Sequence, residues 1–285
     1  MWDQATRAVL ADGRDHWQHG PIDLIIEVWG EPAAVSAAKK LAWQGFSGIL
    51  PTLVAELAAL RQPLQRHQPA QFNGAVAQRM LAACEPFAAQ FITPMAAVAG
   101  AVADEVMASF AQAPGITKAY VNNGGDIAAT VKPGESLKIA VLDVVTRKIG
   151  TVPIYFEAPW RGVATSGWRG RSFSLGIADA VTVLAASAAQ ADAAATMIAN
   201  AVNLEHAAIQ RAPACTLKDD TDLGELLVTT AVAALPAALV AQALRAGAET
   251  AQDCVSRGLI AAALLQLQGQ WHTTEHDSRL TFWEK

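Results

Sequence analysis

Charged side chains are scarce in this sequence. Asp, Glu, Lys and Arg make up 16% of the 285 residues, while apolar residues make up 52%; roughly 25% charged residues is typical of soluble proteins. A chain with so little charge hides much of its surface in a large core, in a subunit interface or in both. Because a subunit interface is one of these explanations, we expect a homo-oligomer. The formal net charge of −5 lacks the basic excess typical of nucleic-acid binding, so we expect no nucleic-acid partner.

Cysteines are also few, and no C-x-x-C pair is present. Cys84, Cys215 and Cys254 are far apart in the sequence, which predicts buried free thiols in a reducing compartment. The start of the chain lacks the basic residues and apolar run of a signal peptide. The two longest uncharged stretches, residues 86–103 and 228–244, contain proline and are shorter than the roughly 20 residues that span a bilayer. We expect buried helices of a cytoplasmic protein that does not bind a membrane.

The apolar pattern predicts strands in the middle of the chain and helices towards both ends. The expected strands are residues 24–29, 118–122, 127–131, 137–143, 150–156 and 180–184. The expected helices are residues 31–60 (split in two by Gly45, Gly48 and Pro51), 71–83, 96–110 with Thr93 as N-cap, the segment around Asp192, and most of 225–270. This order favours an α+β fold in which alanine-rich helices cover a mostly antiparallel sheet. Without a repeat or a low-complexity linker, we expect residues 1–285 to form a single domain.

The first polar motif is the turn Asn122-Asn123-Gly124-Gly125-Asp126, between two expected strands. Paired glycines let the backbone approach a ligand closely, and asparagine tolerates left-handed conformations. The same residues are typical of a tight β-hairpin. Taken alone, the motif is equally compatible with a ligand-lining loop and a plain hairpin.

The second polar motif covers residues 164–171 (ATSGWRGR). A turn rich in hydroxyl groups offers backbone N–H groups to an anion, and each guanidinium can bind two phosphate or carboxylate oxygens. The predicted anion-binding residues are Thr165, Ser166, Gly167, Arg169 and Arg171. In the alternative, one or both arginines pair with Asp126, Asp179 or Asp192 in a buried network; the two roles are compatible.

A metal site is predicted in the helix that follows. Asp192 and Thr196 are four residues apart, so their side chains point the same way from a helix and can share a hard cation such as Mg²⁺. A phosphorylated ligand held together with a metal is therefore expected.

Near the start of the chain, His16, His19 and Asp23 flank the Gly-Pro turn of residues 20–21. These residue types could form a metal or acid–base cluster. Because they lie on both sides of a turn that leads into a strand, their side chains need not converge, and we favour polar loop residues.

Taken in order, the GGD turn, the ATSG turn, the following Thr-Val strand and the helix motif A-D-x-x-x-T resemble the ApbE-like superfamily of FAD:protein FMN transferases, over roughly residues 93–203. The resemblance implies the ApbE-like fold, a Mg²⁺ cofactor bound by Asp192 and Thr196, and FAD or a related flavin as ligand. Residues 95–104 (MAAVAGAVAD) are similar to the K-G-x-x-x-D helix of that family. The longer strings, such as VNNGGDIA and ATSGWRGRSFSLGIADAVTV, are most similar to an uncharacterised branch of it.

The sequence departs from the transferases at two sites. Ala99 stands where they carry a lysine, and residues 173–179 (FSLGIAD) lack the histidine and proline of their Ser-His-Ile-Asp-Pro segment. We therefore expect a Mg²⁺-dependent enzyme that transfers or hydrolyses a phosphoester or anhydride of a flavin- or nucleotide-like ligand. The alternatives are a non-catalytic flavin- or nucleotide-binding protein of the same fold, and a step in the biosynthesis of a pterin-linked one-carbon cofactor.

Overall fold

The computed structural model of the protein describes residues 4–65, 71–142 and 149–275. The chain divides into two compact units, each described here by itself. The first unit consists of Met1–Leu137, Pro153–Val163 and Ala186–Gln190, and the second of Lys138–Val152, Ala164–Ala185 and Ala191–Lys285. That the whole chain is a single domain stays a prediction.

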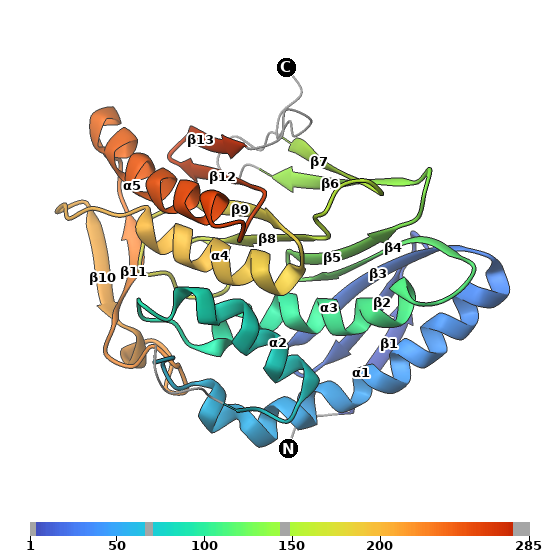
Figure 1. The fold of residues 1–285 in the computed structure, drawn as a ribbon. Coiled ribbons are helices and arrows are strands. Elements are labelled where there is room, and N and C mark those ends of the chain that lie inside the picture. Colours follow the sequence, from blue (N-terminus) through green and yellow to red (C-terminus); the bar gives the residue numbers. More distant parts are fainter. Residues whose placement is uncertain (1–3, 66–70, 143–148, 276–285) are drawn as a thin grey trace. The chain divides into compact units, whose positions relative to one another are not determined.

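The first unit is built on an antiparallel sheet whose strands follow one another in sequence (Figure 1). These strands are β1 (Thr6–Val9), β2 (Asp15–His19), β3 (Ile22–Gly30), β4 (Ile116–Asn123) and β5 (Asp126–Val131), followed at the edge of β5 by the first residues of β8 (Gly162–Ser166). Strand β3 shows the physical reason for the fold, because its side chains alternate between the two faces. Ile22, Leu24 and Ile26 are buried, and Asp23 and Ile25 between them are only half-buried.

Helices cover the face of this sheet on which Leu24 and Ile26 lie. They are α1 (Pro32–Leu60), α2 (Ala75–Cys84) and α3 (Val98–Ala111), with short 3-10 turns η1 (Glu85–Phe87) and η2 (Pro94–Ala97) between α2 and α3. Helix α3 packs on β4 and β5, and both α1 and α2 pack against α3 (Figure 1). Thr93, expected as a helix N-cap, precedes the turn η2 and makes no side-chain capping bond there.

The prediction of two helices in residues 31–60 is wrong. Helix α1 continues through Gly45, Gly48 and Pro51 without a break. A proline in a helix interior costs about 3 kcal/mol of stability, but one face of α1 is buried along most of the helix. Phe46 on that face is fully buried and contacts Trp17 of β2, with 5.6 Å between ring centroids. Tertiary packing outweighs the local preference for a break.

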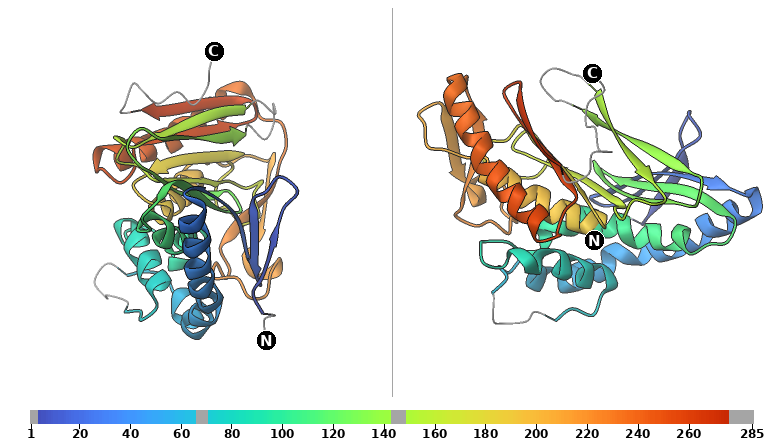
Figure 2. Two further views of the ribbon diagram at one scale, coloured as in Figure 1. Left: turned by 90° about the vertical axis from the view of Figure 1, so that its right-hand side faces the viewer. Right: turned by 45° about the horizontal axis from the view of Figure 1, so that its top comes forward.

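The second unit combines a sheet with two long helices. Its sheet strands are the last residues of β8, then β9 (Ala180–Ala185), β12 (Ala262–Leu267) and β13 (Gln270–Glu275), and both β9 and β13 pair antiparallel with β12. Helix α4 (Ala188–Ala201) begins in the first unit and continues in the second, and α5 (Ala237–Ser256) packs along β12 and β13 (Figure 2). The unit also contains η3 (Ala214–Thr216) and the separate antiparallel pair β10 (Ile209–Pro213) and β11 (Leu227–Val232). Strands β6 (Ser136–Leu142) and β7 (Ile149–Tyr155) pair with each other, and each belongs partly to the first unit.

The α+β fold with a mostly antiparallel sheet and alanine-rich helices is confirmed. The expectation of a mostly helical segment at residues 225–270 is wrong, because this segment contains β11, α5 and β12. Residues 262–267 (AALLQL) are buried throughout, and periodicity does not distinguish such a short apolar run from part of a buried helix. Residues 227–232 (LVTTAV) show no regular alternation either. The expected strand at residues 137–143 is confirmed as far as Leu142; Asp143 lies outside the described residues.

The structure bears on the expectations for the three cysteines and for the long uncharged stretches. Cys84 and Cys254 are buried free thiols, as predicted, but Cys215 is half-exposed because its side chain lies in the loop beside Glu225, 3.1 Å from Sγ to Oε1. Among the described residues, one helical stretch, Pro94–Ala111, is long and apolar enough to cross a membrane by length and composition; half of it is buried inside the protein. A core helix passes the same test, so this stretch is weak evidence for a membrane segment.

Candidate functional site

The predicted site residues are divided between the two units. The first unit contains the turn residues Asn122, Asn123, Gly124, Gly125 and Asp126. The second unit contains Thr165, Ser166, Gly167, Arg169, Arg171, Asp192 and Thr196.

In the first unit, residues 122–126 form a β-hairpin. Asn123 of β4 pairs with Asp126 of β5, and Gly124 and Gly125 between them have φ angles of 66° and 116°. A hairpin loop of two residues with positive φ at both positions is what paired glycines permit. The side chain of Asn122 closes the turn by accepting a hydrogen bond from the Gly125 N–H at 2.8 Å. A hairpin is thus formed, and the role of these residues in ligand binding stays a prediction.

In the second unit, the segment expected as a turn is partly strand. Thr165 and Ser166 end strand β8, and the Oγ1 atoms of Thr165 and Thr182 on β9 are 2.9 Å apart. The chain turns only at Gly167. A Cβ atom at Gly167 would lie 2.6 Å from the Asp179 carbonyl oxygen, so a side chain there would force the two backbone segments apart. Glycine therefore allows the turn to pack directly on the backbone of Ala178 and Asp179.

The two arginines of this turn differ in their contacts. Arg169 forms an ion pair with Asp179, with 2.6 Å between Nε and Oδ1, and the Asp179 side chain is only 1% exposed. Trp168 donates its indole N–H to the same oxygen at 3.2 Å, and the Arg169 guanidinium lies over its ring, 4.5 Å from the centroid. The alternative of a buried network is therefore confirmed for Arg169. Arg171 is exposed and, within the described part of the chain, makes no hydrogen bond or ion pair.

Helix α4 presents one polar stripe. Asp192, Thr196 and Asn200 follow one another at intervals of four residues and are half-buried, whereas the alanines between them are fully buried. Residues at this spacing lie on one face of a helix. The Asn200 side-chain oxygen accepts a hydrogen bond from the Leu175 N–H at 2.9 Å. The end of the stripe thus binds the loop that follows the arginine turn.

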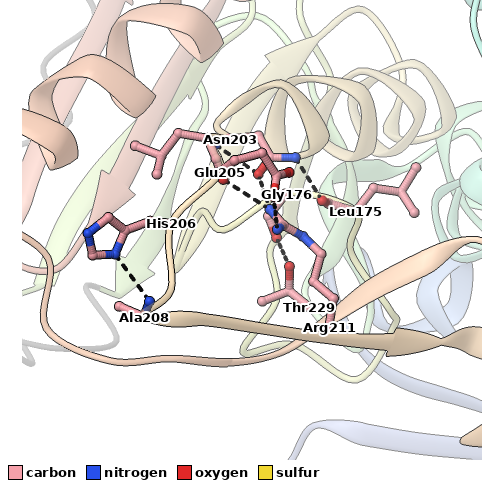
Figure 3. Close-up of polar contacts among 9 residues, drawn as sticks. Leu175, Gly176, Asn203, Glu205, His206, Ala208, Arg211 and Thr229 are labelled. Carbon is pink, nitrogen blue, oxygen red and sulfur yellow. Dashed lines mark hydrogen bonds and ion pairs between the residues drawn. The ribbon is translucent and has the colours of Figure 1, made fainter.

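That loop is held from several elements, as Figure 3 shows. Asn203, just after α4, donates to the Leu175 carbonyl at 3.0 Å, and Thr229 of β11 donates its hydroxyl to the Gly176 carbonyl at 2.8 Å. Arg211 of β10 in turn donates to the Asn203 side-chain oxygen at 2.6 Å. These bonds fix the backbone of residues 175–176, and Asp179 is held separately by its backbone bond to the Gln266 carbonyl and by the Gln268 N–H group.

The N-terminal cluster is partly formed. His16 on β2 and Asp23 on β3 lie in adjacent strands, with 2.9 Å between Nε2 and Oδ1. The expectation of polar loop residues is wrong, because His16, His19 and Asp23 lie on two strands that the turn brings together as antiparallel partners. His19 lies elsewhere, buried near Phe46 with 6.3 Å between ring centroids. Among the described residues, no group of three or more His, Cys, Asp or Glu side chains is arranged to hold a metal ion.

Asp104 of α3 has a structural role within the first unit. Its two carboxylate oxygens accept hydrogen bonds from the N–H groups of Ala188 and Ala189 at 3.0 and 2.9 Å. These are among the N–H groups that a helix leaves unpaired at its start. Burial raises the pKa of the Asp104 carboxyl above its ordinary value of 3.8, although the two backbone bonds act in the opposite direction.

Sequence reasoning missed most of the residues that fix the loop. Asn200, Asn203, Arg211 and Thr229 come from three elements. Polar residues that bind a distant backbone carry no periodic signal. Asn200 alone could have been found, because it continues the spacing of Asp192 and Thr196 by one more helical turn.

The chain is similar to several known proteins. A protein-family model described as AbpE bacteria matches residues 7–273. A UPF0280 protein of Methanopyrus kandleri is 40% identical over 139 residues, which cover 48% of this chain and 54% of that protein. A UPF0280 protein of Methanosarcina acetivorans is 29% identical over 209 residues, 72% of this chain and 79% of that protein. In most of the similar proteins, the match spans about half of the relative's length.

Two solved structures are also similar. The apo form of the flavinyl transferase ApbE of Pseudomonas stutzeri has a TM-score of 0.41 at 14% identity, covering 96% of this chain and 94% of that one. The apbe protein of Thermotoga maritima has a TM-score of 0.41 at 12% identity, with coverage of 96% and 97%.

The described elements form an α+β protein, and the order of its motifs resembles that of the ApbE-like superfamily. Because the family model matches nearly the whole chain, the protein belongs to the family described as AbpE bacteria. The chain is also similar to UPF0280 proteins.

Proposed function

We propose that the protein is a Mg²⁺-dependent enzyme that acts on a phosphorylated, flavin- or nucleotide-like molecule. It would transfer or hydrolyse a phosphoester or phosphoanhydride. The observation that carries this proposal is that Arg169 and Arg171, two residues apart in the turn after β8, have different surroundings. Asp179 fixes Arg169, while Arg171 remains exposed on the same turn. An exposed guanidinium held next to a loop with fixed backbone is suited to phosphate oxygens.

The donor atoms on α4 fit the proposed metal. Asp192 and Thr196 supply a carboxylate and a hydroxyl from one face of the helix, and both are half-buried. Mg²⁺ prefers oxygen ligands and keeps several waters, so one or two protein ligands together with substrate phosphates suffice. This requirement is compatible with the absence of a larger acidic cluster in the described residues. When bound, Mg²⁺ would neutralise charge that develops on the leaving phosphate.

The residues of the chain would bind and orient the ligand. Arg171 would hold a phosphate, with Thr165, Ser166 and Gly167 as further contacts. The N–H groups of Trp168 and Gly170 already donate to the carbonyls of Ala178 and Gly167, so the guanidinium would supply the main hydrogen bonds. The hairpin at Asn122–Asp126 is proposed as a further contact. A small phosphorylated molecule is the proposed partner, without nucleic acid or membrane, in a reducing cytoplasmic setting.

The metal site can be tested through stability. A ligand that binds only the folded state raises the melting temperature by mass action, so we expect millimolar Mg²⁺ to raise that of the wild type. Asp192→Ala should abolish the increase. Asp219→Ala, which removes the same charge from an exposed loop position, is the matched control and should retain it. A wild-type melting temperature that is indifferent to Mg²⁺, with and without nucleotide, would contradict the metal site.

The reaction is tested with FAD. Incubation of the protein with FAD and Mg²⁺ should release AMP, because cleavage of the pyrophosphate separates AMP from FMN whether water or another hydroxyl is the acceptor. Chromatography of the products measures this directly. Binding of FAD without release of AMP would instead support a non-catalytic binding protein.

A further inference from the structure

One side chain of the second unit carries two buried polar atoms without partners. Gln266 of β12 is 3% exposed, and neither its Oε1 nor its Nε2 makes a hydrogen bond. An amide donor and acceptor left unpaired in the interior cost free energy. Folded proteins contain few such groups. Among the described residues, Gln266 alone has two such atoms on one side chain, which indicates that something outside the chain pairs with it.

The sheet register shows which side chains surround this amide. Gln266 pairs with Ala180 of β9 on one side and with Trp271 of β13 on the other. Directly paired residues share one face of a sheet. Ala180 contributes only a methyl group beside the amide, and the Trp271 side chain is 55% exposed. Thr182, two residues along β9, is on the same face and is bonded to Thr165.

This face is the one directed away from α5. The neighbouring residue Leu265 points to the other side, where a Cβ atom on Gly247 of α5 would lie 2.8 Å from its Cδ2 atom. Because successive side chains of a strand alternate, Gln266 points away from that helix. The amide therefore belongs to a sheet face with small and hydroxyl-bearing neighbours and one large exposed ring.

We propose that Gln266 binds the polar edge of a planar heterocycle, with the exposed ring of Trp271 as a stacking surface beside it. A primary amide presents an N–H donor next to a carbonyl acceptor. It matches a ring edge that carries an acceptor next to a donor. The lactam edge of a flavin and the amino edge of adenine both have this pattern. The inference rests on the proposed function, since it concerns the ring of the same phosphorylated ligand.

The test is Gln266→Leu, which keeps nearly the same size without polar atoms. In the protein without ligand, the urea midpoint should rise, because an unpaired buried amide is removed. Binding of FMN and of AMP is then measured separately by calorimetry. The ligand whose ring pairs with Gln266 should lose about tenfold in affinity, and the other should not. Loss for FMN assigns the flavin ring to this site, and loss for AMP assigns adenine.

Thr274→Val is the matched control. Thr274 is 5% exposed and its hydroxyl is also unpaired, but it pairs with Ala263 and so lies on the opposite face. This variant should raise the urea midpoint and leave both affinities unchanged. Two outcomes overturn this inference but leave the proposed function standing. One is a lower urea midpoint for Gln266→Leu, and the other is an unchanged affinity of this variant for both ligands when the wild type binds one of them. A wild type that binds neither FMN nor AMP overturns it together with the proposed function.

Discussion

Arg169 and Arg171 are separated by one glycine, yet they have different surroundings. Arg169 neutralises a carboxylate that is almost fully buried, whereas Arg171 points to solvent. Removing a charge that stabilises the fold should lower the free energy of unfolding, whereas removing a charge that is available to a ligand should lower the affinity for that ligand. The contrast between these neighbours therefore separates stability from binding within one turn.

We expect Arg169→Gln to lower the free energy of unfolding by about 1–3 kcal/mol, because Asp179 loses a charged hydrogen-bond partner. The loss is smaller than for a fully buried pair, since Arg169 itself is exposed and Asp179 keeps the Trp168 and Gln268 N–H groups. Urea unfolding of the protein without ligand measures the change. An unaltered midpoint would show that the ion pair contributes nothing to the fold.

Arg171→Gln should give the opposite pattern. Its effect on the free energy of unfolding is expected within about 0.5 kcal/mol, as for other exposed positions. Affinity for FMN or AMP should fall by about 1.5–3 kcal/mol if Arg171 holds the phosphate. Calorimetry measures that affinity, and riboflavin, which has no phosphate, is the control ligand. Equal affinity of wild type and Arg171→Gln for both nucleotides would exclude Arg171 from the anion site.

Asp104 gives a prediction about pH. Because burial raises its native pKa above 3.8, the folded state takes up this proton before the unfolded chain does. The free energy of unfolding contributed by Asp104 therefore rises as the pH falls through the native pKa, and it levels off below 3.8. Relative to Asp104→Asn, which cannot ionise, the wild type should lose stability as the pH rises through the same range. Urea unfolding across pH 3.5–7 tests this, and a difference that is independent of pH would contradict it.

At the scale of elements, short apolar runs rich in β-branched residues could be predicted as strands, whereas the alanine-rich segment 225–270 could not be divided into its strands and helix. Residues 24–29 and 180–184 lie in β3 and β9 as expected. Alanine fits both a helix and a buried strand, so residues 262–267 were assigned wrongly. For the site, the sequence predicted the motifs and one ion-pair partner, Asp179. It could not predict the bonds of Asn203 or Thr229, which depend on how distant elements meet.

Helix α1 offers a test of packing against local preference. Pro51 is exposed within it, so Pro51→Ala restores a backbone donor and removes no buried contact. We expect the free energy of unfolding to rise by about 1–3 kcal/mol. Gly45→Ala is a smaller change at a position with open space around the new methyl group, and it should add about 0.5–1 kcal/mol. A destabilised Pro51→Ala variant would mean that α1 is bent at this point for a structural reason.

At the scale of the whole molecule, low charge has two explanations. The described core is large and rich in alanine, which accounts for part of the composition. Large apolar side chains are nevertheless exposed on α1, with Leu41 at 59%. Gly45 and Gly48 follow it on the same helical face, which would let a second copy approach closely. The exposed leucine and the two glycines therefore favour self-association through this face of α1.

We therefore expect sedimentation at micromolar concentration to give a mass of about twice the 29.9 kDa of one chain. Leu41→Glu should shift the protein towards the monomer, because a buried unpaired carboxylate opposes association. Leu217→Glu alters an exposed leucine outside the long helices and should leave the dimer intact. A monomeric wild type would contradict the expectation, and the scarcity of charge would then follow from the core alone.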